Sequence, residues 1–162
     1  MLVRFVKNSP AAPADALACV RPNGSMTQGA MARQGILPHE AFHFVVETVL
    51  SWHDSFFGHV ARGDSLVDVA SRFHDQKRAW TKNTQGMQSE SLIECLQAEQ
   101  WGGASDPAEF AGRLVATCRR NGVVPPDITA DELDRIRAAL REFGAAWRPL
   151  NTGQTLERTF GS

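Results

Sequence analysis

Segments rich in β-forming residues lie at both ends of the chain, and helical patterns fill the part between them. Residues 2–7, 16–21 and 25–31 have the composition of short strands, and Pro22-Asn23-Gly24 between the last two is typical of a hairpin turn. Residues 155–160 are also β-prone, and a terminal strand usually stays ordered by joining a sheet, so we expect this segment to pair with the N-terminal strands. The pattern predicts an α+β fold, in which a small antiparallel sheet packs against about four to five helices.

Residues 38–53 predict the central helix of this fold. At about 100° per residue the apolar side chains form one broad stripe, with His39 and His43 at its border. The stripe consists of Ala41, Phe42, Val45, Val46, Val49, Leu50 and Trp52. Pro38 suits the first turn of a helix, because its missing N–H would be unpaired there in any case. The histidines are therefore expected at the edge of the core.

Shorter elements follow the central helix. Residues 55–63 contain two glycines that interrupt a long helix, so we expect a turn region with buried aromatic side chains there. Ser65 and Asp68 fit a capping box at the start of a helical piece that extends to about residue 73. Residues 77–88 are polar and mixed, which predicts a loop.

Three further helices are predicted in the last part of the chain. The first starts at Ser89 or Ser91 and stops at a pair of glycines. Asp106 precedes a proline and is a typical N-cap for the second, and Thr129 opens the third, which Pro149 ends.

The length and composition indicate a single domain that spans residues 1–162, because 162 residues of which 43% are hydrophobic can form one sizeable core. With 17 basic and 18 acidic side chains the net charge is -1, so neither nucleic acid nor an anionic membrane is an expected partner. The N-terminus lacks the long apolar stretch of a signal peptide or membrane span, which favours a cytoplasmic protein. The 3 cysteines are widely spaced without a C-x-x-C pair and are expected to be reduced, buried thiols.

The predicted central helix contains the pattern His-Glu-x-x-His at His39, Glu40 and His43. Residues four apart lie on one face of a helix, so the two imidazoles can share one zinc ion while Glu40 acts as a general base toward a bound water. A catalytic zinc ion takes three protein ligands, and a third one must therefore come from elsewhere. We expect it to be Glu94, with Glu90 as the alternative, since both lie on a later helix that can pack across the first.

Glu47 continues the spacing of the two histidines along the helix. Its Cα is about 12 Å along the axis from that of His39, which is too far for easy chelation together with both imidazoles. It can instead accept a hydrogen bond from the ring N–H of His43, as an acid that orients a metal ligand.

The pentapeptide from His39 to His43 resembles the zincin metallopeptidases, in which the two histidines bind zinc and the glutamate is the general base. The longer metzincin pattern requires a glycine and a histidine where this chain has Val46 and Val49, so that branch is excluded. A gluzincin-like arrangement takes its third ligand from a glutamate on a later helix. The resemblance implies a zinc-dependent hydrolase.

A second resemblance covers more of the chain. Residues 37–47, 58–63 and 147–153 are similar to a group of small uncharacterised bacterial proteins, in which an aspartate often follows the first histidine. A more distant similarity links the chain to ubiquinone-biosynthesis proteins that carry a His-Asp-x-x-His metal motif with a downstream glutamate. This chain has Ser55 where that glutamate would fall.

Two functional hypotheses follow from the sequence. The first is a metal-dependent hydrolase that acts on an unidentified small molecule or peptide. The second is a non-catalytic binding or interaction module, in which the helix with His39 and His43 is structural and its polar edge lines a ligand groove or a homodimer interface. Four bulky side chains fit either the core or such an interface, namely Trp52, Phe56, Phe57 and Trp101.

Overall fold

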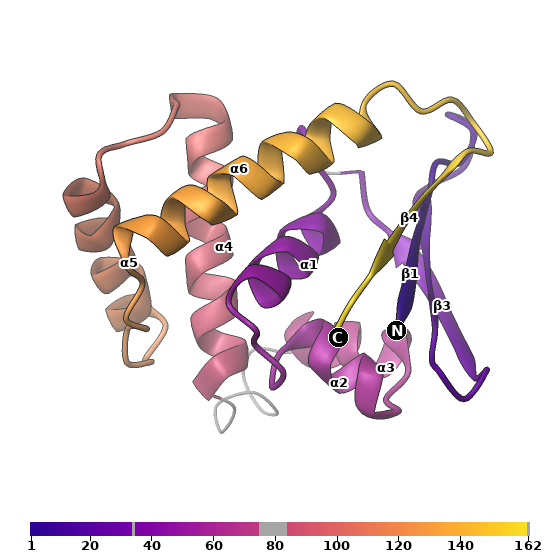
Figure 1. The fold of residues 1–162 in the computed structure, drawn as a ribbon, viewed down its shortest axis with the longest axis horizontal. Helices are drawn as coiled ribbons and strands as arrows, with labels where there is room; N and C mark the ends of the chain where they lie inside the picture. The colour runs from indigo at the N-terminus through magenta and orange to yellow at the C-terminus, as the bar shows by residue number, and fades with distance from the viewer. Residues whose placement is uncertain (34, 75–83, 162) are drawn as a thin grey trace.

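The computed structural model describes residues 1–33, 35–74 and 84–161. These residues form a four-stranded antiparallel sheet and six helices, which confirms the predicted α+β class (Figure 1). The elements in chain order are β1 (Leu2–Val6), β2 (Asp15–Val20), β3 (Met26–Met31), α1 (His39–Val49), α2 (Phe56–Arg62), α3 (Leu66–His74), α4 (Thr84–Gly102), α5 (Pro107–Arg120), α6 (Ala130–Trp147) and β4 (Thr155–Thr159).

The sheet has the strand order β3-β2-β1-β4, and every neighbouring pair is antiparallel. The predicted hairpin joins β2 to β3, and the amide of Arg21 closes it with a 2.9 Å hydrogen bond to the carbonyl of Ser25. The predicted C-terminal strand pairs with β1, so that Phe5 lies opposite Leu156. Both termini therefore lie at the same end of the sheet (Figure 1).

One face of the sheet is apolar and carries the core. Side chains on this face alternate along the strands with half-exposed ones, as expected for a sheet that is covered on one side. Phe5 packs edge-to-face against Phe44 of α1 at 5.8 Å and against Phe143 of α6 at 4.9 Å between ring centroids. Helices α1 and α6 thus cover this face.

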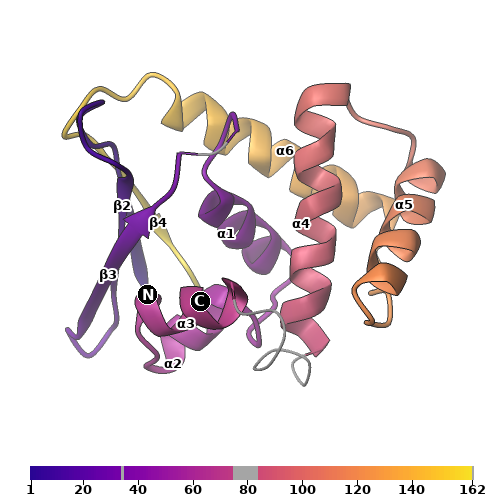
Figure 2. The ribbon, with the colours of Figure 1, turned by 180° about the vertical axis from the view of Figure 1, so that it is seen from behind.

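Helix α1 occupies the middle of the molecule, with the sheet on one side and α4 on the other, while α6 runs across it (Figures 1 and 2). Its position confirms the predicted central helix, but the helix ends at Val49 instead of residue 53. Ser51 adopts a positive φ of 53°, and the amide of Trp52 bonds to the carbonyl of Glu47 at 2.9 Å. Pro38 is the N-cap, one residue before the first helical position.

The predictions for two segments were wrong. Residues 55–63 contain helix α2 instead of a turn region, so the described residues hold six helices where about four to five were expected. The glycine that argued against a helix, Gly58, is buried and lies so close to the backbone of His53 that a side chain would not fit. The predicted loop 77–88 is helical from Thr84, where α4 begins, and its earlier part lies outside the described residues.

The caps predicted at Ser65, Asp106 and Thr129 are present, whereas the helix start predicted at Ser89 or Ser91 was wrong, because both serines lie inside α4. The hydroxyl of Ser65 accepts a hydrogen bond from the amide of Asp68 at 3.1 Å, and Asp106 caps α5. Thr129 and Glu132 form a full capping box at the start of α6. These local pairs fix where the helices begin.

All three cysteines are buried and free, as predicted. Burial raises the pKa of the Cys19 thiol to about 12, outweighing the opposing effect of nearby Arg21. None of the helices in the described part of the chain has the length and hydropathy of a membrane span.

Candidate metal centre

Helix α1 presents His39 and His43 on one face, toward α4. Their Nε2 atoms are 3.2 Å apart, and the rings meet edge-to-face with centroids 4.9 Å apart. The side chain of His43 is 1% exposed and that of His39 is 33% exposed. The spacing of four residues has brought the two imidazoles together as expected, with one ring in the core and one reaching solvent.

Glu90 of α4 completes the cluster. Its Oε1 lies 2.9 Å from Nε2 of His43, and its Oε2 lies 3.5 Å from Nε2 of His39. One ligand atom from each of the three side chains lies within 4.8 Å of the others, and no further group of this kind occurs among the described residues. Two helices far apart in sequence thus place three metal-ligand side chains around one point.

The preferred third ligand from the sequence, Glu94, is not part of this cluster. Its carboxylate is exposed and pairs with Arg120 of α5 at 2.5 and 2.6 Å. Seven residues on a helix return the side chain to within about 20° of its starting direction, so Glu90 and Gln97 share one face of α4, and both contact the histidines. The face of α4 that meets α1 therefore carries Glu90 and Gln97, while Glu94 points toward α5.

Gln97 and Ser89 also contact the histidines, and neither contact was predicted from the sequence. The side-chain amide of Gln97 lies 3.3 Å from Nδ1 of His39, and the hydroxyl of Ser89 lies 3.4 Å from Nδ1 of His43. The signal that could have identified Gln97 is its seven-residue spacing from Glu90.

Glu47 lies beside His43, as predicted. Its side chain is 0% exposed, and its Oε1 is 3.2 Å from Nδ1 of His43. The other oxygen, Oε2, accepts hydrogen bonds from the amides of Phe57 at 2.9 Å and Gly58 at 3.1 Å, which lie in the first turn of α2. The N-terminal amides of a helix are natural partners for an anion, so α2 helps to hold this carboxylate in the core.

His43 and Glu90 stabilise each other's charged forms. Burial disfavours a charged imidazole, but Glu90 and Glu47 outweigh it and raise the pKa of His43 from 6.5 to about 9. Burial likewise acts against a charged Glu90, yet the charge of His43 and hydrogen bonds from both histidines hold the pKa of this carboxyl well below its usual range. Without a metal, the neighbouring Glu90 thus favours the protonated form of His43.

Glu40, the predicted general base, follows His39 in the first turn of α1 and is partly buried. Its Oε2 atom is shielded from solvent.

Comparisons with known proteins identify no relative, since no protein-family model, curated protein or solved structure matches the chain. The resemblances to zincins and to the bacterial group therefore stay predictions. A function for this protein has to be argued from the geometry of the site.

The packing of Gly58 gives a test of how α2 supports Glu47. A Cβ at this position would overlap the backbone carbonyl of His53, so Gly58→Ala should destabilise the fold by about 2–3 kcal/mol. Gly112→Ala is the matched control, because Gly112 is also helical but has nothing within 4 Å of an added Cβ. The control should be neutral or stabilising by up to about 1 kcal/mol. Urea unfolding of both variants measures this difference, and equal stabilities would contradict the packing described for α2.

Proposed function

We propose that the protein binds one zinc ion through Nε2 of His39, Nε2 of His43 and the carboxylate of Glu90. The observation that supports this most is the spacing of the ligand atoms. The two Nε2 atoms are 3.2 Å apart, Oε1 of Glu90 is 2.9 Å from Nε2 of His43, and Oε2 of Glu90 is 3.5 Å from Nε2 of His39. These separations, which involve both carboxylate oxygens, bracket the about 3.3 Å expected between ligands of a tetrahedral zinc ion with bonds near 2.0 Å. The side chains thus need little rearrangement to receive the ion.

The surrounding polar groups suit the same role. A histidine that binds a metal through Nε2 usually donates its Nδ1–H to a carboxylate or another acceptor. Glu47 is placed to accept from His43, and the amide oxygen of Gln97 is placed to accept from His39, once the amide is oriented with its oxygen toward the ring. Both histidines then direct an Nε2 lone pair at the ion.

We further propose that the site is hydrolytic. Three protein ligands leave a fourth zinc position for water, and zinc in such a site supplies a nucleophile by lowering the pKa of that water to about 7. His39 is 33% exposed, so the centre is reachable from solvent. Glu40 is the general base in this proposal, because it belongs to the same first turn of α1 and its carboxylate is partly buried. The substrate is a small molecule or peptide.

Metal analysis tests the zinc site. Protein purified without added metal should contain about one equivalent of zinc, and Glu90→Gln should lower the zinc affinity by at least about tenfold because a ligand loses its charge. Glu94→Gln is the matched control on the same helix and should keep wild-type affinity, since Glu94 pairs with Arg120 instead. Elemental analysis and competition with a zinc chelator provide both measurements.

Three results of this experiment would contradict the proposal. Equal losses in the two variants would show that Glu90 is not a ligand. Iron in place of zinc would overturn the choice of metal, because two histidines and a carboxylate also bind iron in oxygenases. Protein that is metal-free and whose melting temperature responds to neither zinc nor EDTA would favour the structural alternative.

The catalytic role of Glu40 is tested by Glu40→Gln in the zinc-loaded protein. We expect hydrolysis of a panel of p-nitrophenyl esters, p-nitrophenyl phosphate and a fluorogenic peptide library to reveal one active class. In that class kcat should fall by about 100-fold or more, while the zinc content stays unchanged, because only proton transfer is removed. Glu142→Gln, an exposed change on α6, serves as the control. Full activity in Glu40→Gln, or no hydrolysis of any member by the wild type, would contradict the hydrolase proposal.

A further inference from the structure

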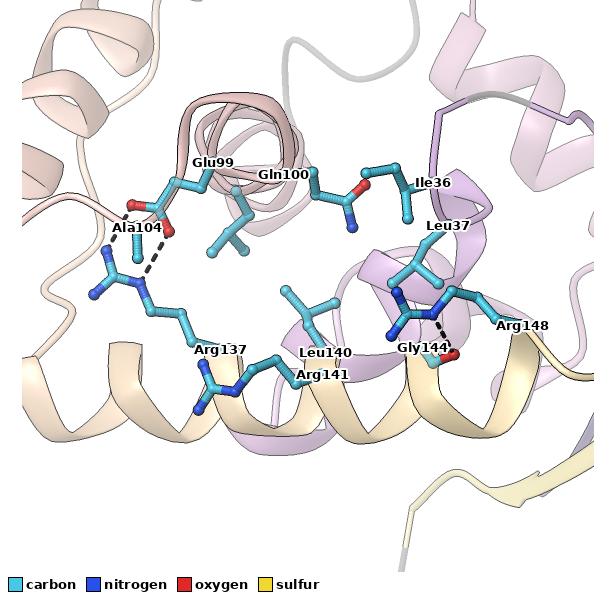
Figure 3. A pocket seen from close by; sticks show the side chains of 11 residues that line it. Ile36, Leu37, Glu99, Gln100, Ala104, Arg137, Leu140, Arg141, Gly144 and Arg148 are labelled. Carbon is cyan, nitrogen blue, oxygen red and sulfur yellow. Dashed lines mark hydrogen bonds and ion pairs between the residues drawn. The ribbon is translucent and has the colours of Figure 1, made fainter.

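A cavity of about 270 Å³ lies between α4 and α6 (Figure 3), and His39, His43 and Glu90 are not among the residues that line it. Residues 36–37, which lead into α1, close one side of it. Leu37, Leu96 and Leu140 come from these three segments and provide its apolar floor. The cavity can therefore take an apolar group of limited size.

The side chains that line the cavity include more positive than negative charges. Arg137 at one end is neutralised by Glu99, with atoms 2.6 Å apart and both side chains largely buried. Arg141 and Arg148 also line the cavity, and neither pairs with an acidic side chain within residues 1–33, 35–74 and 84–161. Arg148 bonds through Nε to a backbone carbonyl, which leaves its two terminal amino groups available to a ligand. The excess charge is positive although the whole chain has a net charge of -1.

A third polar group faces the same space from the opposite helix. The side-chain amide of Gln100 lines the cavity and makes no hydrogen bond with another described residue. An apolar floor with a few convergent polar groups at its margin is the usual construction of a small-molecule site.

We propose that this cavity binds a small aliphatic carboxylate, with its chain against Leu37, Leu96 and Leu140 and its head group at Arg141 and Arg148. A guanidinium offers parallel N–H donors that match a carboxylate. The volume lies just below the 300–1,000 Å³ of sites for drug-sized ligands, so the ligand has about ten non-hydrogen atoms or fewer.

The surrounding helices favour a carboxylate over a phosphate. Phosphate sites typically use backbone amides at a helix N-terminus. This cavity instead lies near the C-terminal ends of α4 and α6, where the partial charge of the helix is negative and opposes a doubly charged anion. A singly charged carboxylate at the two arginines meets less repulsion from these helix ends than a doubly charged phosphate would.

An NMR titration of the ¹⁵N-labelled protein with sodium octanoate tests this site. The titration is done in EDTA, so that its result does not depend on zinc binding. Octanoate should shift the amide signals of residues 36–37, 96–104 and 137–148. Octan-1-ol, which lacks the charge, and acetate, which lacks the chain, should each bind at least about tenfold more weakly.

Arginine variants in and next to α6 distinguish octanoate binding in this cavity from unspecific binding elsewhere on the protein. Arg141→Gln and Arg148→Gln should each weaken octanoate binding by about tenfold, since each removes a charged hydrogen-bond donor from the head group. Arg135→Gln is the control on the same helix, because Arg135 is exposed, pairs with Asp131 and does not line the cavity. Equal binding of octanoate and octan-1-ol, shifts confined to other regions, or equal affinity in all three variants would overturn the proposal.

Discussion

The buried carboxylate of Glu47 is the interaction on which the centre of the structure depends. It has no exposure to solvent, and the core tolerates so polar a group because hydrogen-bond partners surround it. One oxygen faces His43 within α1, and the other binds the first amides of α2. A single side chain therefore fixes the orientation of an imidazole and the direction in which the chain continues. The turn at Ser51 lies between these two contacts, and Gly58, whose amide binds Glu47, also packs closely against the backbone of His53.

Most of the fold can be predicted from local sequence, because turn residues and capping residues mark where the strands and helices begin and end. The turn Pro22-Asn23-Gly24 defines the hairpin, and Thr129 with Glu132 defines the start of α6. Helix α2 escaped prediction because Gly58 is a poor helix former in isolation, and only contacts with Glu47 and His53 explain its presence there. The early start of α4 also escaped prediction, because its first turns, which include the buried Gly86, lie in a segment that looks like a polar loop.

The candidate site was predictable only as far as it lies on one helix. The relation of His39, His43 and Glu47 follows from the helical period, and the structure places all three accordingly. The choice between Glu90 and Glu94 depends on which face of α4 meets α1, and this is set by packing between segments about 50 residues apart. The sequence identifies both acids as candidates, but it does not show which face of α4 packs against α1.

The central claim is that His39, His43 and Glu90 together bind one zinc ion, and X-ray absorption at the zinc edge tests it most directly. The spectrum of the zinc-loaded protein should show four nitrogen or oxygen neighbours at about 2.0 Å, including the outer-shell scattering of two imidazoles, and no sulfur. In His43→Ala the contribution of one imidazole should disappear. A wild-type spectrum with six oxygen neighbours, a sulfur ligand or no imidazole scattering would contradict the account.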